Sequence, residues 1–290
     1  VLVDFSDVDA ARTRFIIRAA IPLGGRALSL YEEVHDSENH PQRLRHFLET
    51  LALILPQNCQ PVLVTDAGFR GTWRDGVSEL GWYYVSRQRN RDLVQLPGDS
   101  HWRPCKSLYA HASVTPRYLG SISICRNTPR QTDAYLYHKP HKGRSALTKA
   151  GRKNQSARSE KIAVGQQEPW LLLSNLPAQL NMAEKVVRIY RQRMQIEEAF
   201  RDLKSHRFGF AFRGNTCKCH YRLEALLLLA SLALFATWLA GLLAVSKCQH
   251  WAMQANTIKH RNVLSVTTIG IRYLSRHTVF SRNDVLVALI

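Results

Sequence analysis

The stretch YRQRMQIEEAFRDLK holds one carboxylate between an aromatic hydroxyl and two cations at regular spacing: Tyr190, Arg193, Glu197 and Lys204. These residues lie at i, i+3, i+7 and i+14, so a single helix over about 182–205 would present all four on one face. Such a face has two interpretations. It is either a solvated stripe of ion pairs or a functional surface on which an acid works beside cations.

Two further acids follow short apolar runs that predict buried strands. VLVDF closes on Asp4, and PVLVTDAGF closes on Asp66 before a turn that contains glycine. Aliphatic runs of this length, bounded by turn residues, are typical of strands. We therefore expect the two acids at the carboxyl ends of two strands.

The elements around these acids follow the order strand, hairpin, helix, strand. Gly24-Gly25 separates two strand-like runs and signals a hairpin, and leucines recur at helical spacing after it. The sequence predicts strands over 14–23, 27–34, 61–69, 79–89 and 170–176 and a helix over 41–55. This order indicates an α/β fold with a mixed sheet flanked by helices, although many α/β folds share it.

The residue pattern changes between Asp66 and the stretch that holds Glu197. Alternating runs at 118–125 and 133–139 predict additional β structure. A basic tract follows over 139–161, with a single acid, Glu160. This tract is either a loop that contacts phosphates or a solvated linker, and the basic character of the whole chain favours contact with DNA.

The charge balance of the chain points to a polyanionic partner. Forty Lys and Arg stand against 22 Asp and Glu, which gives a formal charge of +18 and a pI near 10.1. Self-repulsion of this size opposes compaction, so stability does not require it. Nucleic acid is the commonest partner for such a surface, and a protein that is merely basic is the alternative.

The six cysteines are too sparse for a secreted disulfide framework, which favours a reducing compartment. A zinc site from Cys217, Cys219, His220, Cys248 and His250 is disfavoured, because Cys-x-Cys is tighter than the usual spacing. The chain begins without an initiator Met, and we expect further sequence upstream.

One segment is long and apolar enough to span a membrane. Residues 225–245 carry no formal charge over 21 residues. A helix that is apolar on all sides is also typical of the centre of a large domain. The single segment in an otherwise polar chain favours the buried helix and no membrane.

The four acid-bearing and strand motifs together resemble insertion-sequence transposases of the IS-four family. The spacing Y-(2)-R-(3)-E-(6)-K is met without a gap, and VLVDFSDVD and VLVTDAGFRG resemble the first- and second-acid motifs. Phe5 stands where a Trp is more usual in the family. WLLLSNL resembles the strand before the signature helix, and the resemblance covers Asp4 to about Leu239.

The resemblance implies a ribonuclease-H-like catalytic core with Asp4, Asp66 and Glu197 as ligands of two Mg²⁺ ions, for which Mn²⁺ can substitute. Three carboxylates are costly without metal because like charges repel, and two ions can stabilise the attacking and leaving oxygens of phosphodiester transfer. The implied DNA contacts are Tyr190, Arg193, Lys204, Trp170, Arg87 and Arg89. Trp170 would stack on a flipped base, or it is an ordinary aromatic residue at a strand start.

The resemblance also implies how the chain is divided and what it binds. Residues 1–91 and 170–245 would form two parts of one catalytic domain, with a β-rich basic insertion over 92–169 and a C-terminal region, 246–290, of unclear role. The expected partners are double-stranded DNA at transposon ends and target, and a second copy of the chain. No nucleotide cofactor and no membrane are expected, and the expected place is the bacterial cytoplasm at the nucleoid. The rival is a truncated, inactive transposase-derived DNA-binding protein, since only three residues precede Asp4.

Overall fold

A computed structural model describes residues 1–9, 12–38, 40–89, 92–139, 165, 167–205, 210–217, 219–254 and 262–276, with residues 281, 283, 284 and 286. The chain divides into two compact units. The first unit contains Val1 and Asn39–Arg193, and the second contains Leu2–Glu38 and Met194–Ile290. Most of the basic tract predicted over 139–161 lies outside the described residues.

The second unit is built on a three-stranded antiparallel sheet in the order β3-β2-β1. Its strands are β1 (Leu2–Asp7), β2 (Phe15–Pro22) and β3 (Ala27–His35). Gly24 and Gly25 turn the chain between β2 and β3 with φ of 63° and 111°, a conformation that favours glycine. The predicted hairpin is therefore confirmed.

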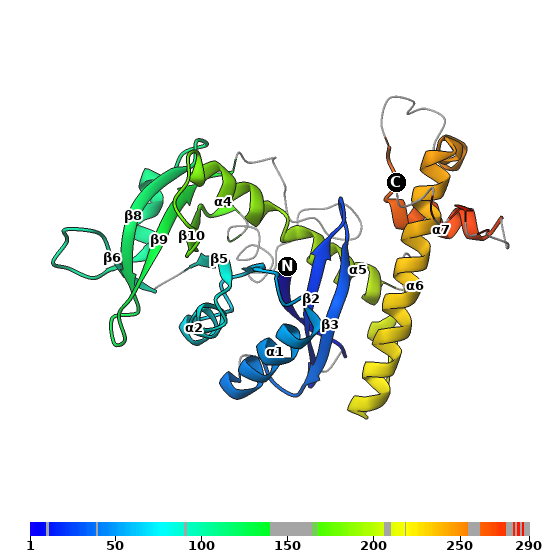
Figure 1. Cartoon of the computed structure of the whole chain (residues 1–290), viewed down its shortest axis with the longest axis horizontal. Coiled ribbons are helices and arrows are strands. Elements are labelled where there is room, and N and C mark those ends of the chain that lie inside the picture. The colour runs from blue at the N-terminus through cyan, green and yellow to red at the C-terminus, as the bar shows by residue number, and fades with distance from the viewer. Residues whose placement is uncertain are drawn as a thin grey trace, which may run out of the picture. The chain divides into compact units, whose positions relative to one another are not determined.

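Helices complete the second unit. α5 (Met194–Lys204) contacts all three strands, and α6 (His220–Ser246) contacts β3. α7 (Val266–Leu274) packs along α6, beside which it lies in Figure 1. Two 3₁₀ turns, η2 (Phe212–Gly214) and η3 (Gln249–Met253), connect these helices.

The first unit holds a seven-stranded mixed sheet in the order β4-β5-β10-β9-β8-β6-β7. β4 and β5 are parallel, and the other pairs are antiparallel. The strands are β4 (Val62–Thr65), β5 (Tyr83–Gln88), β6 (Leu93–Gln95), β7 (Arg103–Pro104), β8 (Arg117–Ile124), β9 (Arg130–Tyr137) and β10 (Trp170–Ser174). The 3₁₀ helix η1 (Cys105–His111) follows β7.

Three α-helices flank this sheet. α1 (Pro41–Ile54) and α2 (Gly71–Glu79) pack together, with Phe47 and Trp73 ring centroids 6.4 Å apart. α4 (Met182–Arg191) lies over β5, β8, β9 and β10 (Figure 1). The predicted mixed sheet flanked by helices is confirmed, and each predicted strand appears within a few residues of its expected bounds.

Two α-helices, α2 and α7, were not anticipated, and one helix that was expected to be continuous is interrupted. α2 begins directly after Asp66 and its turn, where a short, mostly polar segment gave little periodicity. The helix expected over 182–205 is two helices, since the Gln192 and Arg193 amides donate to the carbonyls three residues back, at 3.1 and 3.0 Å. This tighter 3₁₀ turn ends α4. Tyr190 and Glu197 therefore do not share one continuous helical face.

Two further expectations are corrected. Asp4 does not end its strand, because β1 continues to Asp7. α6 is not buried on all sides: Leu243 is buried near its C-terminus, whereas Leu228 and Leu229 near its N-terminus are each 62% exposed. It is the one helix in the described part of the chain whose length and composition would allow a membrane span, a test that core helices also pass.

Candidate active site

Asp4 belongs to a row of charged side chains that crosses the sheet of the second unit. It is 9% exposed, and its Oδ1 accepts the Phe5 amide at 2.9 Å. Arg18 on β2 lies directly opposite Asp4, and Glu32 on β3 lies directly opposite Arg18. Arg18 Nε and Glu32 Oε1 are 2.8 Å apart. The row places an arginine between two acids on three neighbouring strands.

The same row shows which face of the sheet Asp4 uses. Arg18 lies over the ring of Phe200 in α5, with its guanidinium carbon 4.5 Å from the ring centroid. Directly opposed residues of antiparallel strands point to the same face. Asp4 therefore points to the face that α5 covers. Glu197 lies about one helical turn before Phe200, so the first and third acids come from surfaces that face each other.

Polar contacts hold α5 on the β2–β3 hairpin. The Gly25 amide donates to Gln195 Oε1 at 3.0 Å, and Arg26 Nε donates to Asp202 Oδ2 at 2.5 Å. Arg26 also pairs with Glu198, at 3.8 Å, and Glu198 pairs with Arg201. The contacts of Gln195 and Asp202 fix the helix that carries Glu197, while Arg26 and Arg201 occupy the neighbouring acid, Glu198.

Lys204, at the end of α5, pairs with an acid. Its Nζ lies 2.8 Å from Asp7 Oδ1, on the last residue of β1. Burial acts to raise the pKa of Asp7, but the hydrogen bond and charge of Lys204 outweigh it and lower that pKa. The ion pair joins the strand of Asp4 to the helix of Glu197. The predicted phosphate contact of Lys204 would compete with this pair.

Asp66 follows β4 in the first unit, as predicted. Its Oδ1 accepts the Gly68 amide at 2.7 Å, and a Cβ at residue 68 would lie 2.9 Å from that oxygen. In the described part of the chain no lysine or arginine forms an ion pair with Asp66. Its carboxylate is thus oriented by the backbone of its own turn.

Tyr190 is a core residue of the first unit. It is 3% exposed, and its ring meets Trp170 edge-on with centroids 4.9 Å apart. Burial raises the pKa of its hydroxyl; the Asp66 carboxylate adds to that effect, while Arg193 and Arg87 oppose it. The guanidinium of Arg193 lies 5.8 Å from the Tyr190 ring centroid. Four of the predicted residues are therefore near neighbours within this unit: Asp66, Trp170, Tyr190 and Arg193.

Arg87 and Arg89 hold the segment that leads into Trp170. Arg87 donates to the carbonyl oxygens of Glu168 and Pro169 at 3.4 and 3.2 Å. Arg89 pairs with the Glu168 carboxylate at 2.8 Å. Burial lowers the pKa of Arg87. These contacts show both arginines positioning the start of β10, and their predicted contact with DNA stays a prediction.

A match to a protein-family model shows which family the chain belongs to. The model described as the transposase DDE domain matches residues 25–236, which include Asp66 and Glu197. The chain belongs to the transposase DDE-domain family. No curated protein gives a significant match to it. The α/β architecture of the DDE domain is thus the ribonuclease-H-like fold that the sequence predicted.

Members of the DDE family generally depend on a divalent metal, and the donor chemistry here fits one. Asp66 offers a carboxylate held by an amide, in a turn where only glycine leaves space beside the oxygen. Oxygen ligands are those that Mg²⁺ prefers. Asp66 lies in the first unit, while Asp4 and Glu197 lie in the second. Across the described ranges no three His, Cys, Asp or Glu side chains form a group that could hold a metal, so the three-acid site remains a prediction.

Five other acids of the chain could be mistaken for metal ligands, and each has a partner of its own. Asp9 accepts a hydrogen bond from the Thr13 amide, and Glu33 pairs with His35. Ion pairs with lysine or arginine occupy the other three acids, which are Asp7, Glu32 and Glu198. His220, from the disfavoured zinc set, pairs with Asp36 at 3.0 Å. The sequence analysis did not predict that the Gly68 amide would bind the Asp66 carboxylate. The DAG turn after Asp66 was the available signal.

Proposed function

We propose that this DDE domain is the catalytic core of a transposase that cuts DNA strands at insertion-sequence ends and joins them to target DNA. The observation that carries the proposal is the placement of Asp4 and Glu197. In a chain of this family, the Asp4–Arg18–Glu32 row faces α5, the helix of the signature acid. Carboxylates that face each other repel, and a metal ion between Asp4 and Glu197 would add positive charge to that of Arg18, which lies opposite Asp4.

The proposed ligands are Asp4, Asp66 and Glu197. When bound, two Mg²⁺ ions, or Mn²⁺ in their place, would stabilise the attacking and leaving oxygens of phosphodiester transfer. The Gly68 amide keeps one oxygen of Asp66 in a fixed direction. The Arg26–Asp202 pair keeps α5 on its sheet, so Glu197 is presented by a rigid element.

The phosphate contacts of the proposal come from the signature cations. Arg193 would contact a phosphate through its planar fork, and Lys204 would do so as a point charge. To bind a phosphate, Lys204 must release Asp7, so one anionic partner replaces another. Trp170 would present the exposed part of its ring to an unstacked base, since it is only half-buried between the rings of Tyr190 and Tyr137, whose centroids lie 4.9 and 5.6 Å away.

The partners belong to the same proposal. The substrate is double-stranded DNA, at the element ends and at the target, and the working form is a homodimer. No nucleotide cofactor and no membrane take part, and the site of action is the bacterial cytoplasm at the nucleoid. The formal charge of +18 supports a polyanionic substrate.

A plasmid-nicking assay with Mg²⁺ or Mn²⁺ tests the proposal, comparing wild type with Glu197→Gln. We expect the variant to lose about 100-fold or more in rate, since several kcal/mol of charge stabilisation depend on the ligand set. Glu198→Gln is the matched control, because it changes the adjacent acid, whose partners are Arg26 and Arg201. It should keep nicking activity. Equal nicking by wild type and Glu197→Gln would overturn the proposal, and DNA binding without nicking in wild type would support the inactive rival.

A further inference from the structure

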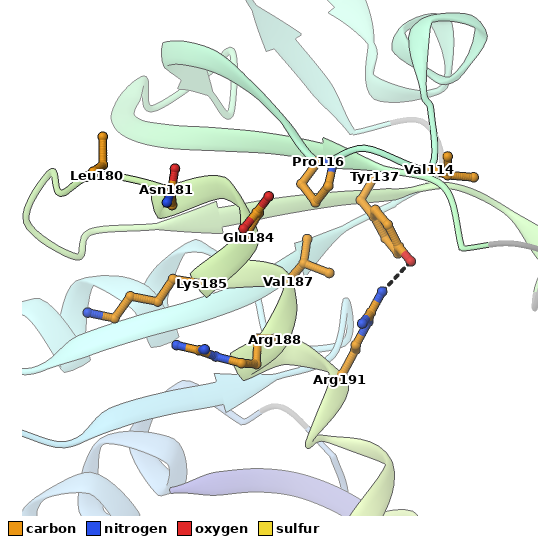
Figure 2. Close-up of a pocket in the computed structure, with 10 residues that line it drawn as sticks. All are labelled: Val114, Pro116, Tyr137, Leu180, Asn181, Glu184, Lys185, Val187, Arg188 and Arg191. Carbon is orange, nitrogen blue, oxygen red and sulfur yellow. Dashed lines mark hydrogen bonds between the residues drawn. The ribbon is translucent and has the colours of Figure 1, made fainter.

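The first unit carries a groove between α4 and the β8–β9 hairpin. Its volume is about 560 Å³, within the range of ligand sites. Figure 2 shows the helix side chains on one wall, and Tyr137 with Val114 and Pro116, which precede β8, on the other. The lining residues are Val114, Pro116, Tyr137, Leu180, Asn181, Glu184, Lys185, Val187, Arg188 and Arg191.

The groove uses a different face of α4 from the signature. Four charged residues of this helix line the groove: Glu184, Lys185, Arg188 and Arg191. The last three lie three residues apart, so they fall on neighbouring positions of one helix face. Tyr190 does not line it and is buried. The groove is therefore a surface of its own, which the predicted active-site residues leave unused.

Cations dominate the helix wall of the groove. Lys185, Arg188 and Arg191 face a single acid, Glu184. Arg188 is exposed, and within the described residues it has no hydrogen-bond or ion-pair partner. At 1.5 Å per residue the three cations span about 9 Å along the helix, while phosphates of one DNA strand recur about every 3.4 Å along the duplex axis. The wall can therefore meet two or three consecutive phosphates.

Arg191 is held in place before any ligand arrives. Its Nη2 donates to the Tyr137 hydroxyl at 2.5 Å, the bond drawn in Figure 2, and its guanidinium carbon lies 5.2 Å from the Tyr137 ring centroid. A fixed guanidinium loses less side-chain entropy on binding than a free one. Tyr137 is 2% exposed, so its ring supports Arg191 and does not offer a stacking surface to a base.

The opposite wall and rim are apolar. Val114 and Leu180 are 61% and 92% exposed, and Pro116 lies between β8 and Val114. Sugars of a nucleic-acid backbone present carbon atoms between the phosphates, so an apolar wall opposite a cationic one suits a sugar–phosphate strand. The absence of an exposed aromatic ring among the lining residues disfavours a site for bases.

We propose that this groove binds the sugar–phosphate backbone of duplex DNA, with Arg188 and Arg191 as its principal phosphate contacts. The inference rests on the proposed function, because it assumes the same DNA substrate. It adds a contact that the predicted DNA-binding residues do not include. Contacts of this kind fix the register of a protein on DNA and carry no sequence information.

Binding of a fluorescent duplex oligonucleotide over a salt series, in EDTA, tests the groove without any catalytic step. Arg188→Gln should weaken binding about fivefold or more at about 0.1 M salt and reduce the log–log salt slope by about 0.9. Arg188→Lys, which keeps the charge, should retain most of the affinity. The melting temperature of each variant should match wild type, since Arg188 is exposed.

Arg126→Gln is the matched control. Arg126 is also exposed, has no partner within the described residues, and lies in the turn at the far end of the β8–β9 hairpin. It removes the same charge from the same unit, about 23 Å of strand away from the groove. We expect its affinity to stay within about twofold of wild type.

The outcomes separate the groove from the proposed function. Equal binding by Arg188→Gln and Arg126→Gln would overturn the groove alone and would leave a protein partner as the better occupant. Wild type that does not bind duplex DNA would overturn both. An unlabelled mononucleotide should not displace the duplex at equal phosphate concentration, and displacement as effective as that by duplex would also overturn the groove as a backbone site.

Discussion

The Gly68 amide donates a 2.7 Å hydrogen bond to Asp66 Oδ1, and a Cβ on residue 68 would stand 2.9 Å from that same oxygen. The contact requires both the backbone N–H and the missing side chain. The Asp66 carboxylate can therefore keep this position only while residue 68 has no side chain. The turn also leads into α2, which begins at Gly71.

Gly68→Ala should impair catalysis while leaving the fold intact. The new methyl group would move the Asp66 carboxylate, which is the end of a side chain, and the backbone would not have to move. A ligand displaced by about 1 Å can cost on the order of 100-fold in rate. The measurement is metal-dependent nicking together with the melting temperature.

Gly71→Ala is the control for that change. A Cβ there would meet the guanidinium of Arg130 at 3.3 Å, which lies at the end of a long side chain and can shift. We expect near wild-type nicking from this variant. Full activity in Gly68→Ala would show that the turn does not direct Asp66.

The sequence predicted the strands and the hairpin well because their signals are local. Gly24-Gly25 predicts the turn of the hairpin, and the aliphatic runs that lead to Asp4 and Asp66 predict β1 and β4. The break after Arg191 was not predicted, because Gln192 and Arg193 are ordinary helix formers.

The sequence predicts candidate residues for the site, but it does not predict the partners of those residues. The Y-R-E-K spacing predicts Glu197 as a ligand, and two apolar strand-like runs predict Asp4 and Asp66, and these three assignments stay predictions. The spacing could not show that Lys204 pairs with Asp7, that Tyr190 is buried, or that Arg87 binds the carbonyl oxygens before Trp170. Each of these contacts joins segments that are distant in the sequence, and the spacing of residues within one segment cannot predict such contacts.

The Lys204–Asp7 pair should make stability depend on pH in the acid range. The pKa of Asp7 is lowered in the folded chain, so its contribution is present above the unfolded value of about 4 and is lost as the pH falls through the folded value. Thermal unfolding at about pH 6 and about pH 3 measures the effect. Asp7→Asn should reduce the fall in melting temperature between these two conditions.

Glu49→Gln provides the comparison for that pH effect. Glu49 is exposed on α1 and pairs with no cation within the described residues. Its replacement should leave the fall in melting temperature unchanged. If both variants respond to acid as wild type does, the ion pair adds nothing to stability.

The Arg26–Asp202 pair should stabilise the second unit more than a surface pair stabilises the first. Its side chains are 16% and 12% exposed, against 66% and 59% for Arg45 and Glu79. Removing Asp202 would leave the largely buried Arg26 with only its longer 3.8 Å pair to Glu198, so Asp202→Asn should cost about 2 kcal/mol or more. Glu79→Gln should cost less than about 1 kcal/mol. Urea unfolding measures both, and similar costs would contradict the role given to Asp202.

The packing of α7 on α6 depends on two glycines that meet the partner backbone. A Cβ on Gly241 would lie 2.0 Å from the Val266 carbonyl oxygen, and one on Gly270 would lie 1.7 Å from that of Thr237. Backbone atoms cannot yield as a flexible side chain can, so Gly270→Ala should separate the helices. Overpacking of this kind costs about 1–3 kcal/mol or more.

Gly76→Ala in α2 is the matched helical control for Gly270→Ala. Its new methyl group would meet only Leu48 Cδ1, at 3.0 Å, and alanine gains up to about 1 kcal/mol of helix propensity over glycine. Both variants gain that propensity, so the difference between them isolates the cost of the close approach. We expect Gly270→Ala to unfold at lower temperature and to be cleaved faster by protease between α6 and α7, because the freed α7 exposes Ile269 and Tyr273 from their shared core with Leu243. A melting temperature for Gly270→Ala that equals that of Gly76→Ala would show that the two helices do not touch backbone to backbone in solution.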